Sequence, residues 1–179
     1  MIIKSIKQKL REYFFVNPTA KCRVRTLETE LELPLPSVIR YCRELEDEGI
    51  LKTERIGNVV FYTADRASGK FLLEKRLHNI KSLYESGLVD FLKEEASNPA
   101  IIVFGSYARG EDIESSDIDM YVETPSTRTG IHIPERFGNE PKRRIQLFVH
   151  KNAAEIKNKE LANNILNGTI LNGFVEVFR

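Results

Sequence analysis

The stretch IIVFGSYARGEDIESSDIDMYVE, residues 101–123, decides how the second half of this chain folds. Its first four residues are apolar, which predicts a short buried strand. The strand leads into Gly105 and Ser106, where glycine permits a turn and a close approach of ligand to backbone. We expect the N–H groups that open the following helix, together with the Ser106 hydroxyl, to meet phosphate oxygens.

Two aspartates, Asp117 and Asp119, follow in the sequence DIDMYVE. Alternate side chains of a strand share a face, so the two carboxylates are expected to project together while Ile118 and Met120 pack the other way. Neighbouring carboxylates repel, and a divalent cation such as Mg²⁺ explains them best, since it takes carboxylate and phosphate oxygens together. Either aspartate alone is explained more simply as a helix cap or a solvated group.

The sequence GSYARG followed by SDID resembles the signature of the minimal nucleotidyltransferases within the DNA polymerase beta superfamily, over roughly residues 70–179. The resemblance implies that Gly105 and Ser106 hold a nucleoside triphosphate and that Asp117 and Asp119 are catalytic residues that ligate metal, with two ions possible. An acceptor hydroxyl would then attack the α-phosphate and expel pyrophosphate.

Arg109 lies on the helix expected after the turn. Two roles are open for it on equal terms: a contact to phosphate or acceptor, and a solvated surface charge. Lys142, Arg143 and Arg144 form a run of three cations. Such a run is usually solvated, and the alternative is that it anchors phosphates or an acidic acceptor.

The family pattern also requires a third carboxylate on a later strand beside the aspartate pair. The candidate strand is RRIQLFVH, residues 143–150, and alternation places Gln146 at that position. A neutral amide ligates a metal through its carbonyl oxygen but cannot act as a base. Glu123, Glu135 and Glu140 are less favoured substitutes, because loop acids are usually solvated and Glu123 lies further along its strand.

The first sixty-six residues predict three helices and a hairpin. The first helix has apolar residues at helical spacing up to Phe14, and a second is expected over 25–33. After Pro34 and Pro36, Ser37 is expected to open a third helix that stops at Gly49. The stretch ILKTERIGNVVFYTA, residues 50–64, contains two β-prone runs around a turn, which predicts the hairpin.

This order resembles the winged helix-turn-helix domains of prokaryotic transcription regulators, with SVIRYCRELEDEGIL as the recognition helix and GILKTERIGNVVFYTA as the wing. The resemblance implies DNA binding. Base contacts would be made by Ser37, Arg40 and Tyr41. Phosphate contacts would be made by Arg43, Lys52 and Arg55. Residues 1–66 hold twelve basic and ten acidic side chains, a thin balance for a DNA-binding protein. The alternative is a protein-interaction or dimerisation module.

The predicted fold class is therefore α+β, with a winged helix over 1–66 and a nucleotidyltransferase domain with a mixed sheet over 67–179. Residues 67–97 are expected to form a connecting helix that Gly87 divides.

The whole chain has 179 residues, 41% of them hydrophobic, with 27 basic and 26 acidic side chains. This composition is typical of a folded chain and not of a disordered one. Its near-neutral charge argues against a protein whose whole surface binds polyanions. Cys22 and Cys42 form neither a disulfide framework nor a zinc motif, which favours a reducing, cytoplasmic location. No apolar run approaches the ~20 residues of a membrane span, so no membrane partner is expected.

These observations favour nucleotide transfer, or at least Mg²⁺–nucleotide binding, coupled to DNA or partner recognition. The family resemblance further implies a protein acceptor such as a HEPN-type ribonuclease toxin, with this chain as the antitoxin. A second hypothesis is a degenerate transferase that senses a nucleotide and regulates DNA binding, and a third is an interaction module without ligand. A homodimer is the expected assembly.

Overall fold

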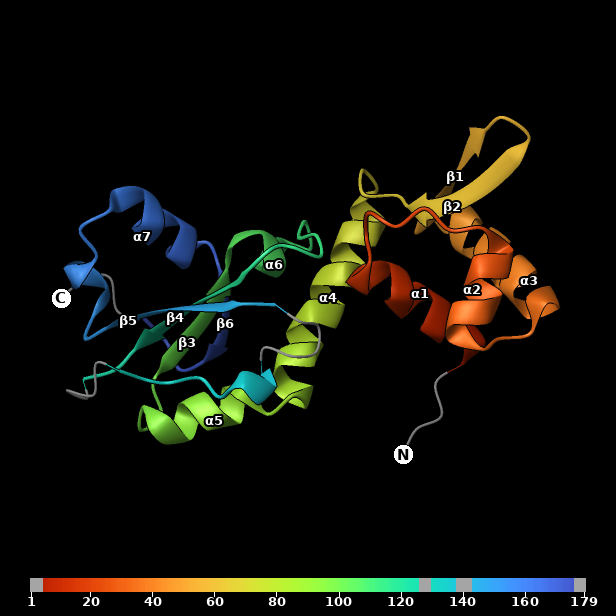
Figure 1. The fold of residues 1–179 in the computed structure, drawn as a ribbon. Coiled ribbons are helices and arrows are strands. Elements are labelled where there is room, and N and C mark those ends of the chain that lie inside the picture. The colour runs from red at the N-terminus through yellow and green to blue at the C-terminus, as the bar shows by residue number, and fades with distance from the viewer. Residues whose placement is uncertain (1–4, 126–129, 138–142, 176–179) are drawn as a thin grey trace. The chain divides into compact units, whose positions relative to one another are not determined.

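The computed structural model describes residues 5–125, 130–137 and 143–175 (Figure 1). The chain divides into two compact units, Met1–His78 and Asn79–Arg179. The division falls inside a helix, whereas the sequence analysis placed a domain boundary after residue 66. None of the helices in the described ranges is long and apolar enough to cross a membrane.

The first unit contains three helices followed by a hairpin, in the order that the sequence predicts. The elements are α1 (Ile6–Val16), α2 (Val24–Leu31), α3 (Leu35–Asp47), β1 (Leu51–Ile56) and β2 (Val59–Ala64). The two strands pair antiparallel. Their shared core consists of apolar side chains from all three helices and the hairpin, among them Leu10, Phe14, Leu27, Cys42, Leu45 and Leu51.

The third helix begins at Leu35, two residues before the predicted start at Ser37. Pro36 lies in its first turn, where the missing N–H of proline costs no helical hydrogen bond. The predicted start of the third helix was therefore two residues too late. The helix ends at Asp47, and Gly49 follows with a φ of 73°, as the predicted stop requires.

Helix α4 (Gly69–Glu85) begins in the first unit and ends in the second. Phe71 and Lys75 from its first half are fully buried, and the Lys75 ammonium donates to the Phe15 carbonyl at 2.6 Å. Gly87, at a φ of 78°, separates α4 from α5 (Leu88–Glu95), as predicted.

The second unit is built on a mixed sheet in the strand order β5-β4-β3-β6. The strands are β3 (Ala100–Phe104), β4 (Ile118–Glu123), β5 (Ile145–His150) and β6 (Thr169–Asn172). Strand β3 pairs antiparallel with β4 and β6, while β4 and β5 run parallel. The short helix α6 (Gly105–Arg109) follows β3 directly, and the 3₁₀ helices are η1 (Glu135–Phe137) and η2 (Ala153–Glu155).

Helices lie on both faces of this sheet (Figure 1), and each face has its own core. Alternate residues of β3 and β4, including Ile101, Val103 and Met120, pack against α5. The residues between them, Ile102, Phe104 and Tyr121, pack with Ile165 of α7 (Lys159–Leu166). Strand alternation puts Asp119, the second residue of β4, on this second face.

Candidate active site

The turn after β3 lies against the Asp119 carboxylate. Gly105 has a φ of 73°, a conformation that side-chain-bearing residues rarely adopt. A Cβ atom built on Gly105 would lie 2.6 Å from Oδ2 of Asp119, closer than real Cβ contacts. The predicted phosphate-binding turn and the aspartate therefore meet at one place, and glycine is required there on both counts.

The strand register sets three groups in a row across the sheet. Phe104, the residue before the turn, is the partner of Asp119 on β4. Asp119 is in turn the partner of Gln146 on β5. The prediction that Gln146 stands beside the aspartate on a later strand is confirmed by this register, and its side chain is exposed.

Asp117 immediately precedes β4 and is not part of the ladder, unlike the strand position that the sequence analysis gave it. Both aspartates are half-buried, while Ile118 and Met120 are buried as predicted. Burial, and then the charge of Asp117, raises the pKa of Asp119. Among the described residues, neither carboxylate has a hydrogen-bond or ion-pair partner, so nothing there relieves their repulsion.

The oxygen donors at this place suit Mg²⁺. The ion prefers carboxylate and other oxygen ligands and completes its shell with water and substrate phosphates. Asp117, Asp119 and the amide oxygen of Gln146 supply that chemistry. Within the described part of the chain no three His, Cys, Asp or Glu side chains are placed to hold a metal ion together.

Ser106 is the second residue of α6 and is half-buried, and its carbonyl accepts the Glu111 N–H at 3.0 Å. The helix has only five residues, so anion binding here would depend on its N–H groups and the Ser106 hydroxyl more than on a helix dipole. Arg109 ends the helix, is exposed, and pairs with Glu111 at 2.6 Å. Its guanidinium is thus a surface charge in this structure.

Other acids considered as replacements for the third carboxylate lie elsewhere. Glu123 is four residues beyond Asp119, about 13 Å along the strand, and accepts the Tyr121 hydroxyl at 3.1 Å. Glu135 is exposed in η1. Glu140 lies outside the described residues.

The expected basic run before β5 does not form a solvated cluster. Arg143 is buried and its guanidinium donates to Oδ2 of Asp112 at 2.5 Å, so the prediction of a solvated or phosphate-anchoring cation was wrong. Arg144 is exposed, and Lys142 lies outside the described residues. Asp112 was not among the predicted site residues, because no local pattern distinguishes it from the neighbouring acids.

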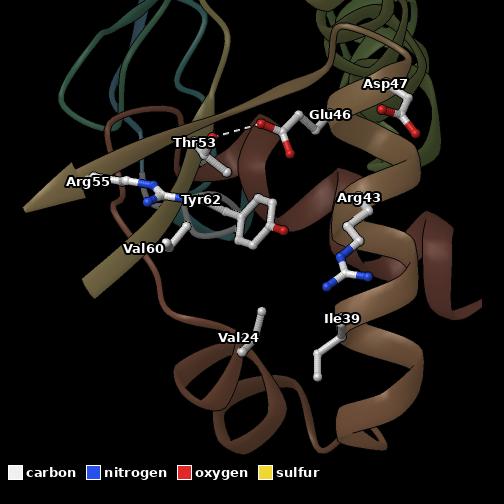
Figure 2. A pocket seen from close by; sticks show the side chains of 9 residues that line it. All are labelled: Val24, Ile39, Arg43, Glu46, Asp47, Thr53, Arg55, Val60 and Tyr62. Atoms are coloured by element: carbon white, nitrogen blue, oxygen red, sulfur yellow. Dashed lines mark hydrogen bonds between the residues drawn. The ribbon is translucent and has the colours of Figure 1, made fainter. Parts of the chain in front are cut away.

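In the first unit a groove of about 630 Å³ lies between α3 and the hairpin (Figure 2). Of the six residues predicted to contact DNA, it brings together Arg43 from α3 and Arg55 from β1, which lie on opposite walls. The same groove contains two acids, and Glu46 accepts the Thr53 hydroxyl at 2.8 Å. Its apolar lining consists of Val24, Ile39, Val60 and the ring of Tyr62.

The remaining predicted contact residues are placed elsewhere in this unit. Arg40 lies 4.3 Å above the ring of Tyr41 and pairs with Glu44, and Ser37 is half-buried in the first part of α3. Lys52 lines a second groove of about 500 Å³, whose other basic lining residues are Lys21 and Arg66.

Comparison with known proteins finds one family for the second unit. Residues 85–171, from the end of α4 to β6, match the family described as "Nucleotidyltransferase domain". Over these residues the second unit is therefore similar to nucleotidyltransferase domains.

Among individual proteins, the chain is similar to one named "Putative protein adenylyltransferase" in Methanocaldococcus jannaschii. The two are 47% identical over 49 residues, which are 27% of this chain and 56% of that relative. The chain thus spans just over half the length of the relative it matches. No solved structure matches the chain.

Proposed function

We propose that the second unit transfers a nucleotide from a magnesium-bound nucleoside triphosphate to a hydroxyl group of an acceptor protein. The close approach of the Gly105 backbone to the Asp119 carboxylate carries this proposal, because it joins a phosphate-binding turn to a metal ligand. The family match supports nucleotide transfer as the reaction class. The name of the similar archaeal protein supports a protein acceptor and adenylate as the transferred group.

Each group then has a defined task. The N–H groups of the turn and the Ser106 hydroxyl bind the triphosphate, with Arg109 available once it leaves Glu111. Asp117 and Asp119 hold Mg²⁺, which when bound neutralises phosphate charge and stabilises the attacking and leaving oxygens. The acceptor oxygen forms a bond to the α-phosphorus while the bond to the bridging oxygen breaks and pyrophosphate leaves. The acceptor proton passes to solvent, since Gln146 cannot accept it.

The test uses the full chain, Mg²⁺ and ATP labelled on the α-phosphate. The acceptors are peptides carrying Tyr, Ser or Thr hydroxyls and a HEPN-type ribonuclease. We expect label on one acceptor, with matched pyrophosphate release, and loss of both in Asp119→Asn. The matched control is Asp90→Asn, which alters an exposed acid that pairs with Lys93 on α5. Absence of both transfer and magnesium–ATP binding would contradict the proposal.

A second candidate function is a nucleotide-sensing regulator that binds DNA and does not turn over. The placement of Gln146 opposite Asp119 favours it, because the expected base is replaced by an amide. The first unit would bind DNA as a winged helix, with Arg43 and Arg55 in the groove of Figure 2 contacting phosphates.

The two candidates separate in one experiment on the full chain. A non-hydrolysable ATP analogue with Mg²⁺ should change retention of a DNA duplex if the regulator is correct, and Arg43→Gln with Arg55→Gln should reduce the salt dependence of that retention. Arg76→Gln, which alters an exposed arginine of α4, is the charge control. Label transfer without duplex retention would favour the transferase, and the antitoxin role requires that the modified acceptor be the ribonuclease.

A further inference from the structure

Asp112 and Arg143 form a buried ion pair that the proposed reaction does not use. The two residues are 1% and 4% exposed, and their carboxylate and guanidinium lie 2.5 Å apart. Asn79 donates to the other Asp112 oxygen at 2.7 Å and to the Tyr107 carbonyl at 2.9 Å. The Arg143 guanidinium also lies 5.5 Å from the centre of the Tyr107 ring. The pair thus fixes two chain segments that are 31 residues apart.

The loop that begins at Asp112 carries Asp117, and both of its ends are hydrogen-bonded to one short segment, Arg143 and Arg144. At its start, the Asp112 side chain is held by Arg143. At its end, the Ile118 N–H donates to the carbonyl of Arg144, the next residue, at 2.9 Å. Between these anchors Ile113 and Ser116 close a turn with two hydrogen bonds of 3.0 Å.

We propose that the Asp112–Arg143 pair positions the Asp117 carboxylate relative to Asp119 and Gln146, an inference that rests on the proposed metal-binding function. Asp119 is held by ladders on both sides, whereas Asp117 precedes its strand and depends on the loop for its place. The segment 143–144 continues directly into β5, so the anchor of Asp117 and the strand of Gln146 are one piece of chain.

The pair also reaches the phosphate-binding side of the site. Tyr107 of α6 packs against Arg143 and bonds to Asn79, while the Glu111 N–H, next to Asp112, donates to the Ser106 carbonyl. One buried pair therefore connects the phosphate-binding turn, the loop of Asp117 and the start of β5.

Stability alone is a weak reason for such a pair. Desolvation of two buried charges offsets most of their attraction, and apolar residues of similar volume often stabilise a fold equally well. The Nε atom of Arg143 is buried without a partner among the described residues, which adds to the cost. What the ion pair provides beyond apolar packing is a fixed direction, which a metal ligand needs from its supporting residues.

The test compares the full-length protein with Asp112→Asn and with the apolar double variant Asp112→Leu/Arg143→Met. The double variant keeps the experiment decisive if the single substitution leaves a buried charge that prevents folding. Asp90→Asn is again the control. The first readout is amide hydrogen exchange at Asp117 and Ile118, and the second is Mn²⁺ affinity in the presence of a non-hydrolysable ATP analogue.

We expect the folded variants to exchange faster at Ile118 and to bind Mn²⁺ about tenfold to a hundredfold more weakly, as loss of a supporting residue usually does. Arg143→Lys, which keeps a cation beside Asp112, should bind Mn²⁺ more tightly than the apolar double variant and more weakly than the wild type. A folded double variant with native exchange at Ile118 and native Mn²⁺ affinity would overturn the inference. If the wild-type protein binds no metal–nucleotide, the proposed function fails instead, and exchange at Ile118 alone then decides whether the pair positions this loop.

Discussion

Replacing Gly105 by alanine tests directly whether the turn after β3 meets Asp119. The substitution has two costs. A side-chain-bearing residue in the left-handed region costs about 1–2 kcal/mol. In addition, the new Cβ would lie 2.6 Å from Oδ2 of Asp119, so the carboxylate must move, and overpacking of this kind costs about 1–3 kcal/mol.

Two further variants separate these costs. Gly87 has nearly the same φ, 78° against 73°, but an added Cβ meets nothing within 4 Å, so Gly87→Ala reports the backbone cost alone. In an Asp119→Ala background, the nearest remaining Asp119 atom is Cβ at 3.7 Å, an ordinary contact. Gly105→Ala should therefore cost about 1–3 kcal/mol less there than in the wild type, a coupling typical of residues in contact.

The assay is urea unfolding of the full chain, with hydrogen exchange at the amides of β3 and β4 to report on the second unit. The magnesium–nucleotide affinity of Gly105→Ala should also fall, because the displaced carboxylate is a proposed metal ligand. Equal costs of Gly105→Ala in both backgrounds, matching that of Gly87→Ala, would refute the contact between the turn and the aspartate.

Three other substitutions or treatments have defined outcomes. Gln146→Glu places a carboxylate one strand spacing, about 5 Å, from Asp119. Repulsion should lower the free energy of unfolding without metal by about 1–3 kcal/mol, and the added ligand should tighten Mg²⁺ binding. Thermal unfolding with a chelator and with Mg²⁺ measures both effects. Burial and Asp117 raise the pKa of Asp119, so folding favours its protonated form. The stability that this form gives to the folded protein is fully present at pH values below the ordinary pKa of 3.8 and is lost as pH rises through the raised pKa. Asp119→Asn should accordingly be more stable than the wild type at neutral pH without metal, and the difference should vanish in acid. Burial raises the pKa of Cys42 to about 12 and also raises that of Cys22. Both thiols should therefore resist alkylation until urea unfolds the protein. Rapid labelling of the native chain would contradict their burial.

Most of the arrangement of Gly105, Asp119 and Gln146 was predictable, because all but one of its steps are short-range. Strand alternation fixes which side chains share a face, and a glycine after a buried strand marks the turn. The family resemblance supplied the one long-range fact, that the strand after residue 142 lies beside β4. Once that neighbour is assumed, alternation alone selects Gln146, and the register agrees.

The Asp112–Arg143 pair was not predictable in the same way. In sequence each residue is a charged group among other charged groups, and solvation is the expected state of both. Their burial is a property of the pair, because neither can leave water without the other. The same limit applied to the first unit: α3 exposes several polar residues, and only the position of the hairpin selects Arg43 and Arg55 as the cations of one groove.

The amide at position 146 also bears on how much positive charge the site needs. Asp119 already has a raised pKa because burial and Asp117 disfavour its ionised form. A third carboxylate across the ladder would add repulsion that only more bound cation could offset. With Gln146 there, the two aspartates carry a charge that one divalent cation balances. A metal-bound triphosphate still carries net negative charge, so an amide in place of the expected base also lowers the repulsion that the proposed magnesium–nucleotide would meet, in a transferase and in a nucleotide sensor alike. Turnover, and not binding, is consequently the property that separates the two proposed functions.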